Sequence, residues 1–479
     1  MPMVTLTLLL LIAGGTFDAQ TTSVPPNIII ILADDLGRGD LGAYNADSRI
    51  PTPHLDQFAL EGMRFTDAHS PSAVCTPTRY GLLTGRYAWR TSLKAWVLGG
   101  YSPLLIETDR PTIASVVHDA GYMTSVVGKW HLGLGSEPKT NYNMPLTPGP
   151  LQLGFDECFL CPASLDMPPY TWVIGETTVV PPTDTIANSS HRRNGGGGMW
   201  RGGAADPGYD HGQTLPIIIE RAVSFIQAAG EGDAPCFLYL PLTAPHTPWM
   251  PTKAWRGSTL VDYYGDFVAQ VDGSIGEVLA AVEAHLDRDN TIVIFTSDNG
   301  SHWPVEDIEA FQHRANGDLR GMKADIHEGG HRVPFIARWP GVIPTGDVSD
   351  ELICLTDLFA TCAALAGQSP DSGGEDSWNI LPVLRGAALL KPIHTEVIHH
   401  SGDGMFAIRM GDWKLIEGLG SGGFTRPKRQ SPEEEGATGQ LYNLAADPGE
   451  TTNLWESEPE MVERLTARLN EVRGETAAP

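Results

Sequence analysis

Runs of consecutive apolar residues, several of them rich in isoleucine and valine, recur along the first two-thirds of the chain. An unbroken apolar run is typical of a strand buried on both faces, as in a parallel sheet. Segments with helical periodicity lie between these runs, at residues 111–120, 215–229 and 261–286. The alternation predicts an α/β domain with a large, mostly parallel central sheet flanked by helices. The expected strands cover residues 26–33, 123–127, 237–241, 291–296 and 333–337.

The pattern changes after residue 368. A turn-rich stretch at 369–374 precedes short segments in which apolar and polar residues alternate, and an amphipathic helix follows at 459–472. Alternation with a period of two indicates strands with one buried face. We therefore expect a main domain at 24–368 and a smaller C-terminal α+β subdomain, with an antiparallel sheet, at 369–479.

The first residues carry an apolar run at 4–13, followed by Ala13-Gly14-Gly15. The run is too short to span a bilayer, and the small residues suit a cleavage point. We interpret residues 1–23 as a signal peptide, although its basic leading segment is missing. The expected mature protein is exported to the periplasm or secreted, without a stable membrane anchor.

Polar side chains follow four of the expected strands. Asp34-Asp35 and Asp298-Asn299 each end one strand, Lys129 and His131 follow another, and His246 follows the fourth. Ligands of open α/β sheets bind beyond the carboxyl ends of the strands. The sequence therefore predicts that these side chains meet in one site.

The pairs Asp34-Asp35 and Asp298-Asn299 offer oxygen ligands without accompanying histidine or cysteine. Such hard donors favour calcium or magnesium over zinc. Aspartate after a strand is also ordinary turn or cap chemistry, and for a single pair that interpretation would be preferred. Two pairs after two buried strands favour a divalent metal site formed by Asp34, Asp35, Asp298 and Asn299.

The run Cys75-Thr76-Pro77-Thr78-Arg79 precedes Thr84-Gly85. If residues 76–83 are helical, Cys75 and Arg79 share one face at the positive end of the helix. A lone cysteine is more often a small buried hydrophobe. Here the neighbouring guanidinium and helix end indicate an anion site that contains a reactive atom.

This run resembles the signature of the type I sulfatases, Cys-x-Pro-x-Arg followed by Thr-Gly. The runs at 128–133, 244–248, 319–323 and 328–334 resemble further sulfatase motifs, so the similarity covers about residues 26–454. It implies an alkaline-phosphatase-like fold for the domain at 24–368. It also implies hydrolysis of a sulfate ester, as in arylsulfatases and N-acetylgalactosamine-6-sulfatases.

The resemblance assigns the site residues. A separate maturation enzyme would convert Cys75 to formylglycine, which is hydrated to a diol and attacks sulfur. Residue 75 would join Asp34, Asp35, Asp298 and Asn299 around a divalent ion, usually calcium. The remaining implied roles are activation of residue 75 by Arg79, sulfate binding by Lys129 and Lys323, proton acceptance by His131, and proton donation to the leaving alcohol by His246. The stretch 324–327 departs from the family pattern, which leaves the local geometry around Lys323 open.

The chain has 58 acidic and 32 basic residues, which gives a net charge of −26. This charge argues against binding to nucleic acid or to an anionic membrane through the overall field. An anionic substrate therefore needs basic residues concentrated at its site. The Gly-rich break at 188–208 carries Arg192, Arg193 and Arg201, which form either a flexible surface loop or a substrate-binding rim.

Six cysteines in 479 residues do not form a disulfide scaffold. We expect Cys158 and Cys161 to form a local disulfide or to be two loop thiols. Cys236 is expected in an apolar strand, and Cys354 and Cys362 in an apolar helix.

Two other functions compete with sulfate ester hydrolysis. A phosphoryl-ester hydrolase could use the same metal-binding fold, and only the Cys75 signal separates it in sequence. A non-catalytic protein that binds sulfated glycans would have lost site residues, whereas every matched position is present. The substrate is expected to be a sulfated small molecule or a sulfated glycan. These motifs do not indicate which ring position carries the sulfate.

Overall fold

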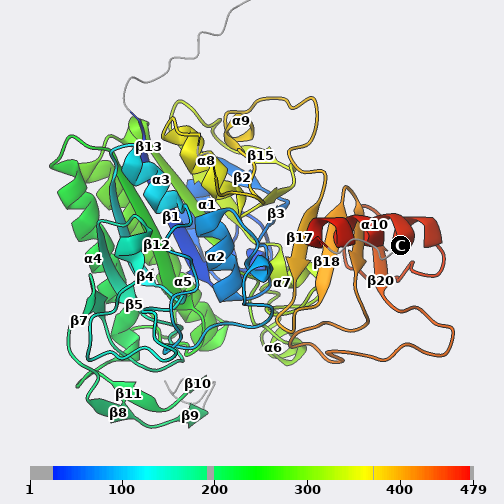
Figure 1. Ribbon diagram of the computed structural model, residues 1–479, viewed down its shortest axis with the longest axis horizontal. Coiled ribbons are helices and arrows are strands. Elements are labelled where there is room, and N and C mark those ends of the chain that lie inside the picture. Colours follow the sequence, from blue (N-terminus) through cyan, green and yellow to red (C-terminus); the bar gives the residue numbers. More distant parts are fainter. Residues whose placement is uncertain (1–24, 191–198, 370–371, 475–479) are drawn as a thin grey trace, which may run out of the picture.

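The computed structural model describes residues 25–190, 199–369 and 372–474, so the expected signal segment lies outside the described residues. A ten-stranded sheet forms the centre of the protein (Figure 1). Its strands, in spatial order, are β15 (Asp347–Ser349), β2 (Met63–Phe65), β14 (Phe335–Arg338), β13 (Thr291–Ser297), β1 (Asn27–Asp34), β12 (Cys236–Pro245), β4 (Met123–Lys129), β5 (Glu157–Cys161), β6 (Val173–Ile174) and β7 (Thr177–Thr178).

Strand β1 lies near the middle of the sheet and pairs in parallel with β12 and β13. Its isoleucines alternate between two cores because successive side chains of a strand point to opposite faces. Ile28 and Ile30 pack in one core, with residues of α2 (Cys75–Thr84), α3 (Ile113–Asp119) and α8 (Asp357–Leu365). Ile29 and Ile31 pack in the other, with α1 (Pro53–Glu61), α4 (Thr214–Gly230) and α5 (Asp262–His285). The continuous apolar run of β1 therefore reflects burial on both faces.

The predicted fold class is confirmed, with one difference in strand direction. Strands β13, β1, β12, β4 and β5 are mutually parallel. The fifth expected strand forms β14, which begins two residues later than expected and runs antiparallel to β13. An apolar run shows that a strand is buried but carries no signal for its direction.

The expected antiparallel sheet of the C-terminal part is present. It contains β17 (Val397–His400), β18 (Phe406–Met410), β19 (Trp413–Ile416) and β20 (Gln440–Asn443), in that order. Helix α10 (Pro459–Arg473) packs on it through Leu465 and Leu469. In Figure 1 this small sheet and α10 lie at one end of the molecule, beside α7 (Glu328–His331).

Three short strand pairs and two short helices complete the described strands and α-helices. The pairs are β3 (Ala68–His69) with β16 (Ile353–Cys354), β8 (Asp184–Ile186) with β11 (Gly203–Ala205), and β9 (Ser189–Ser190) with β10 (Met199–Trp200). The helices are α6 (Val305–Phe311) and α9 (Leu381–Leu384). Within the described ranges, no helix has the length and apolar character needed to cross a membrane.

The cysteines correct two expectations. Cys158 and Cys161 are free thiols in β5, neither disulfide-bonded nor in a loop. Residues three apart in a strand point to opposite faces, which separates the two sulfur atoms. Cys354 lies in β16, whereas Cys362 lies in α8 as expected. Cys236 begins β12 and is buried, as expected.

Candidate active site

The carboxyl ends of four neighbouring parallel strands bring the expected site residues together. Asp34 ends β1, and Asp298 directly follows β13, whose Ser297 pairs with Ala33. On the other side of β1, Asp34 pairs with Pro245 of β12, which places His246 beside the aspartates. Lys129 ends β4, the next strand along. The shared edge of the sheet therefore assembles residues that lie far apart in sequence.

Asp34, Asp35, Asp298 and Asn299 are all buried at this edge. The Asp35 amide donates to Asp298 Oδ1 at 3.1 Å, and Asn299 Nδ2 donates to Asp35 Oδ1 at 2.7 Å. Asp35 has φ of 64°, a left-handed conformation that is uncommon for a residue with a side chain. Such conformations persist where the surroundings fix them, often in functional sites.

Cys75 is the first residue of α2, and its thiol is buried against the carboxylates. The Cys75 sulfur lies within 4.8 Å of ligand oxygens of Asp34 and Asp298. His131 Nδ1 is 3.4 Å from the same sulfur. The helix therefore places its positive end and a reactive side chain directly at the metal-type ligands, as the sequence predicts.

Arg79 extends one turn further along α2 and is fully buried. Its Nη2 donates to Asp298 Oδ2 at 2.7 Å and lies 3.4 Å from Asp34 Oδ1. Its Nη1 donates to the Lys129 carbonyl oxygen at 3.1 Å. One guanidinium thus fixes α2 to the ends of three strands.

Two lysines neutralise the acidic pair that follows β1. Lys129 Nζ lies 2.7 Å from Asp34 Oδ2, and Lys323 Nζ lies 2.8 Å from Asp35 Oδ2. Gly128 allows the close approach of β4 to β12, because a Cβ there would lie 2.0 Å from the Pro241 oxygen. The two lysines thus reach the site from segments that lie far apart in the sequence.

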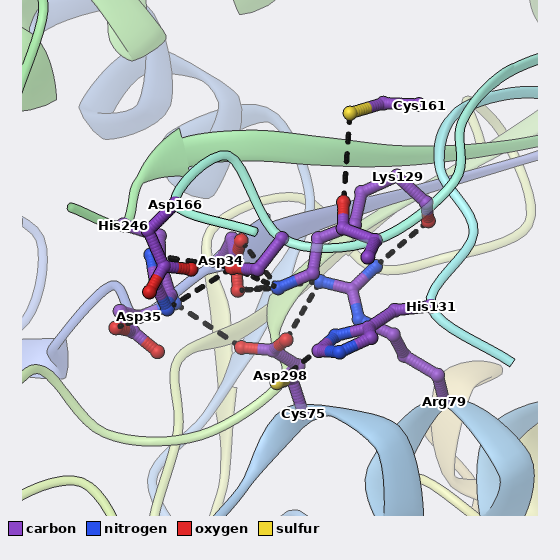
Figure 2. Close-up of polar contacts among 12 residues, drawn as sticks. Asp34, Asp35, Cys75, Arg79, Lys129, His131, Cys161, Asp166, His246 and Asp298 are labelled. Atoms are coloured by element: carbon purple, nitrogen blue, oxygen red, sulfur yellow. Dashed lines mark hydrogen bonds and ion pairs between the residues drawn. The ribbon is translucent and has the colours of Figure 1, made fainter. Parts of the chain in front are cut away.

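His246 approaches from the side of Asp35, whereas His131 and Arg79 lie on the other side of the group (Figure 2). His246 Nε2 lies 3.6 Å from Asp35 Oδ2. The site is most open near Lys323 and His246, which are 8% and 6% exposed, whereas Asp34 and Lys129 are fully buried. A substrate would therefore enter beside Lys323 and His246.

Ser164 belongs to the site but was not predicted from the sequence. Its hydroxyl lies 3.2 Å from both Lys129 Nζ and His246 Nε2. It follows β5, the strand next to β4, by three residues. A serine without a charged neighbour gives little signal in sequence. Its position beyond the carboxyl end of a parallel strand is the one feature that could have indicated it.

The expected arginine rim is only partly described. Arg201 is exposed and forms an ion pair with Asp166, which is buried. Its backbone amide also donates to the Asp166 carbonyl oxygen at 2.9 Å. Arg192 and Arg193 lie outside the described residues.

Comparison with known proteins identifies this arrangement. A family model described as Sulfatase matches residues 26–368. The chain belongs to the sulfatase family. Its members are sulfuric ester hydrolases, so the expected family and enzyme class are confirmed.

Individual relatives of this sulfatase agree. N-acetylgalactosamine-6-O-sulfatase of Bacteroides thetaiotaomicron is 35% identical, covering 95% of this chain and 94% of its own. Arylsulfatase A of Bos taurus is 33% identical, covering 95% and 87%. A solved structure titled for the metabolism of multiple glycosaminoglycans by Bacteroides thetaiotaomicron matches with a TM-score of 0.82 and 33% identity, covering 94% of this chain and all of that one.

Burial and neighbouring charges shift the pKa values of the ionisable groups in this sulfatase site. Burial opposes ionisation of Asp34, but Lys129, His246 and Arg79 outweigh it and hold its pKa well below the usual range. Burial, with the charge of Asp34, raises the pKa of Asp298 to about 7. Burial also raises the pKa of the Cys75 thiol. An unmodified Cys75 is therefore a neutral thiol and a poor nucleophile at neutral pH.

His131 is held neutral. Burial, with the charges of Lys129 and Arg79, keeps its pKa well below the usual value. Its Nε2 lies 2.8 Å from the Leu98 carbonyl oxygen, which can only accept a hydrogen bond. The proton of the neutral ring is therefore on Nε2, and the Nδ1 lone pair faces residue 75.

The donor set fits a hard divalent cation. Asn299 Oδ1 is buried and has no hydrogen-bond partner among the described residues. Buried polar atoms are usually paired, so this oxygen has the character of a ligand. It accompanies three aspartates, and carboxylate and amide oxygens are ligands that calcium and magnesium prefer. Asp34, Asp35, Asp298 and Asn299 therefore fit the metal that the family implies.

A second buried cluster resembles a metal site by composition alone. His69, His331 and His399 offer ring nitrogens within 4.8 Å of one another. The rings of His331 and His399 are stacked, with centroids 3.9 Å apart and planes 14° apart. Lone pairs lie in the ring planes, so stacked rings cannot both aim at one ion. Lys414 Nζ also lies 3.1 Å from His331 Nε2, which makes this cluster a structural network.

Proposed function

We propose that this sulfatase removes sulfate from a sulfated glycan, with residue 75 as formylglycine and calcium or magnesium in the site. The observation that carries the proposal is the position of Cys75. Its side chain lies at the positive end of α2, within 4.8 Å of Asp34 and Asp298 oxygens and beside Arg79 and His131. A phosphoryl-ester hydrolase would have no need of a cysteine at this position.

Formylglycine and the cation would supply the nucleophile and the means to activate it. Formylglycine at residue 75 would offer a hydrated aldehyde oxygen as the nucleophile toward sulfur, and the cation would favour its ionised form and withdraw charge from the sulfate. Asp34, Asp35, Asp298 and Asn299 would hold the cation. A maturation enzyme must act as a partner, because no ordinary side chain chemistry of this chain performs the conversion of Cys75.

The side chains of this chain have complementary tasks. Lys129 and Lys323 bring two positive charges to the position where sulfate oxygens gain charge in the transition state. Arg79 is bound to Asp298, Asp34 and the Lys129 carbonyl, and therefore holds α2 and the nucleophile in place. Ser164 orients Lys129 and His246 together through its hydroxyl.

Proton transfer divides between the two histidines. The Nδ1 lone pair of His131 faces residue 75 at 3.4 Å and can accept a proton from a hydroxyl there. His246 lies on the open side of the site with Lys323, where the alcohol part of the substrate must leave. We assign His246 as the proton donor to that alcohol, which separates the two steps on opposite sides of sulfur.

The substrate class rests on the relatives. The curated relatives include an N-acetylgalactosamine-6-O-sulfatase with 35% identity over nearly the whole chain. We therefore propose a galactosamine 6-sulfate within a glycan as the substrate, with aryl sulfates as slower substitutes. Export to the periplasm or outside the cell, as the N-terminal apolar run predicts, would bring the enzyme to such a polymer.

Peptide mass and turnover together test the proposal. The chain is produced with a formylglycine-generating enzyme, and the peptide containing residue 75 is weighed for the loss expected when a thiol becomes an aldehyde. The converted protein should release sulfate from N-acetylgalactosamine 6-sulfate faster than from its 4-sulfate, and should prefer aryl sulfate over aryl phosphate. Cys75→Ala should abolish turnover. A fully converted protein that hydrolyses aryl phosphate but no sulfate ester would contradict the proposal.

A further inference from the structure

Three aromatic rings and a lysine gather on segments that lie beside Lys323. The Trp96 and Phe424 rings lie 5.8 Å apart, and the His302 ring lies 5.1 Å from Phe424. Lys428 Nζ lies 5.7 Å from the centre of each of the Trp96 and Phe424 rings. We call Trp96, His302, Phe424 and Lys428 the aromatic mouth. Trp96 is 36% exposed, so its ring is accessible.

Backbone hydrogen bonds connect the segments that carry the aromatic mouth to the segment that carries Lys323. The Lys323 amide donates to the oxygen of Ser301, the residue before His302, at 3.1 Å. The Trp96 amide donates to the Gly402 oxygen at 2.8 Å, and the Gly402 amide donates to the Ala324 oxygen at 2.8 Å. A Cβ on Gly402 would lie 3.0 Å from both the Ala324 side chain and the Trp96 ring, so the ring lies near the residue that follows Lys323.

The backbone at Trp96 is held in an unfavourable conformation. Trp96 has φ of 57°, in the left-handed region that bulky residues rarely adopt. In this chain Asp35 and His131, which belong to the site, have the same conformation. Strain of this kind persists where the surroundings fix it, and it is concentrated at functional positions. The fold thus holds the partly exposed Trp96 ring in place at a conformational cost.

The segment that carries Phe424 and Lys428 is basic, whereas the protein as a whole is acidic. The chain carries a net charge of −26, yet Arg426, Lys428 and Arg429 are all exposed within four residues. The segment is held in place by the amides of Ser421 and Gly422, which donate to the oxygens of Pro427 and Lys428 at 3.0 and 2.7 Å. A fixed basic segment on an acidic protein favours an anionic ligand at this place.

We propose that the aromatic mouth binds the sugar next to the sulfated one in an anionic glycan chain. The apolar face of that sugar packs on Trp96 and Phe424, and Lys428 contacts its carboxylate or sulfate. The inference rests on the proposed function, because it takes the sulfated sugar to lie at Lys323. It adds that the enzyme recognises an anionic glycan chain rather than an isolated sulfated monosaccharide.

Binding to an inactive full-length protein tests this inference separately from catalysis. In a Cys75→Ala background, calorimetry compares a 6-sulfated chondroitin tetrasaccharide with N-acetylgalactosamine 6-sulfate. Trp96→Ala and Phe424→Ala should each weaken tetrasaccharide binding by about threefold to tenfold, the value of an aromatic contact. Lys428→Glu should weaken it by about twofold to fivefold, as for an exposed charge pair, and should reduce its salt dependence. Monosaccharide binding should stay within about twofold, because the changes lie outside the sulfate site.

Matched controls are Trp378→Ala and Lys391→Glu, which alter an exposed tryptophan and an exposed lysine in another part of the chain. Both should leave tetrasaccharide binding unchanged. Lys428→Glu alters an exposed side chain and keeps the test valid if an aromatic variant fails to fold. The inference is overturned if the Cys75→Ala parent binds both ligands equally, or if the mouth variants weaken binding of the monosaccharide as much as binding of the tetrasaccharide. Failure of the converted wild type to hydrolyse sulfate esters, with tetrasaccharide preference intact, would instead refute the proposed function.

Discussion

Arg79 and Asp298 form an ion pair that is fully buried, with Nη2 2.7 Å from Oδ2. The pair connects the helix that carries Cys75 to the strand end that offers metal ligands. Breaking a buried pair by removing one partner leaves an uncompensated charge, which costs about 3–5 kcal/mol. We predict that Arg79→Ala lowers the free energy of unfolding by that amount in urea titrations of the unconverted, metal-free protein.

The control for this prediction is Arg314→Ala, which breaks an ion pair with Asp318 whose two side chains are 57% and 99% exposed. Exposed pairs contribute about 0–1 kcal/mol, so its unfolding midpoint should hardly move. Equal stability of the Arg79→Ala protein and wild type would show that Asp298 is compensated in some other way.

The unpaired Asn299 oxygen predicts a measurable effect of metal on stability. Calcium at a hundred times its dissociation constant should stabilise the unconverted protein by about 2.7 kcal/mol, because it binds only the folded state. Asn299→Ala should weaken this effect, as seen in thermal melting with and without calcium. Asn470→Ala on α10 should retain the full effect. Stabilisation by zinc but not by calcium or magnesium would contradict the assigned donor set.

Ser164 shares its hydroxyl between Lys129 and His246, which predicts a kinetic role. Ser164→Ala removes one hydrogen bond to a charged group, worth about 1.5–3 kcal/mol. We expect the converted variant to lose at least about tenfold in kcat, with a smaller change in KM, because both partners act on the reacting groups. Ser92→Ala, an exposed serine, is the matched control. An unchanged kcat would show that Lys129 and His246 are oriented without Ser164.

Buried histidines predict sensitivity to acid. Burial lowers the pKa of His400 to about 4, and that of His327 to about 3. In the unfolded chain both would titrate near the ordinary value of about 6.5. Between these pH values the unfolded state binds more protons than the folded state. The free energy of unfolding is therefore unaffected by these histidines above about pH 6.5 and falls as the pH decreases below it.

The pH dependence of the free energy of unfolding can be tested at His400. Each such histidine contributes about 1.4 kcal/mol per pH unit across its window. His400→Leu should therefore flatten the fall in unfolding free energy between about pH 6.5 and pH 4 by that amount. Urea unfolding at half-unit pH steps measures the slope. A slope identical to that of wild type would mean that His400 is protonated in the folded protein.

The strand ends explain how much of the site the sequence could predict. Asp34, Asp298 and Lys129 follow apolar runs, and parallel strands bring their carboxyl ends to one edge, so the convergence follows from pattern alone. The Cys75 motif could be placed because Cys75 and Arg79, four residues apart, share one face at the start of a helix. Periodicity and the expected parallel sheet were enough for this convergence, whereas Lys323 and the individual roles came from the resemblance to the sulfatases.

Features that depend on tertiary pairing could not be predicted. Ser164 acts only because β5 pairs with β4, and no charge or repeat marks it in the sequence. The direction of β14 depends on how the chain returns after α7. Cys354 lies in a two-residue strand immediately before α8, where its amide donates to Asp357 Oδ2 at 2.8 Å. Such a short strand is too brief for periodicity to distinguish it from the adjoining helix.

The central position of β1 has a consequence for synthesis of the protein. Its isoleucines are all fully buried, yet its partners β12 and β13 begin at Cys236 and Thr291, more than two hundred residues later. At about 5–20 residues per second, the ribosome needs about ten seconds or more to supply them. During that time the highly apolar β1 segment lacks the two strands with which it pairs in the folded protein. Slower translation should therefore increase aggregation, and chaperones that cover the nascent N-terminal segment should increase the yield.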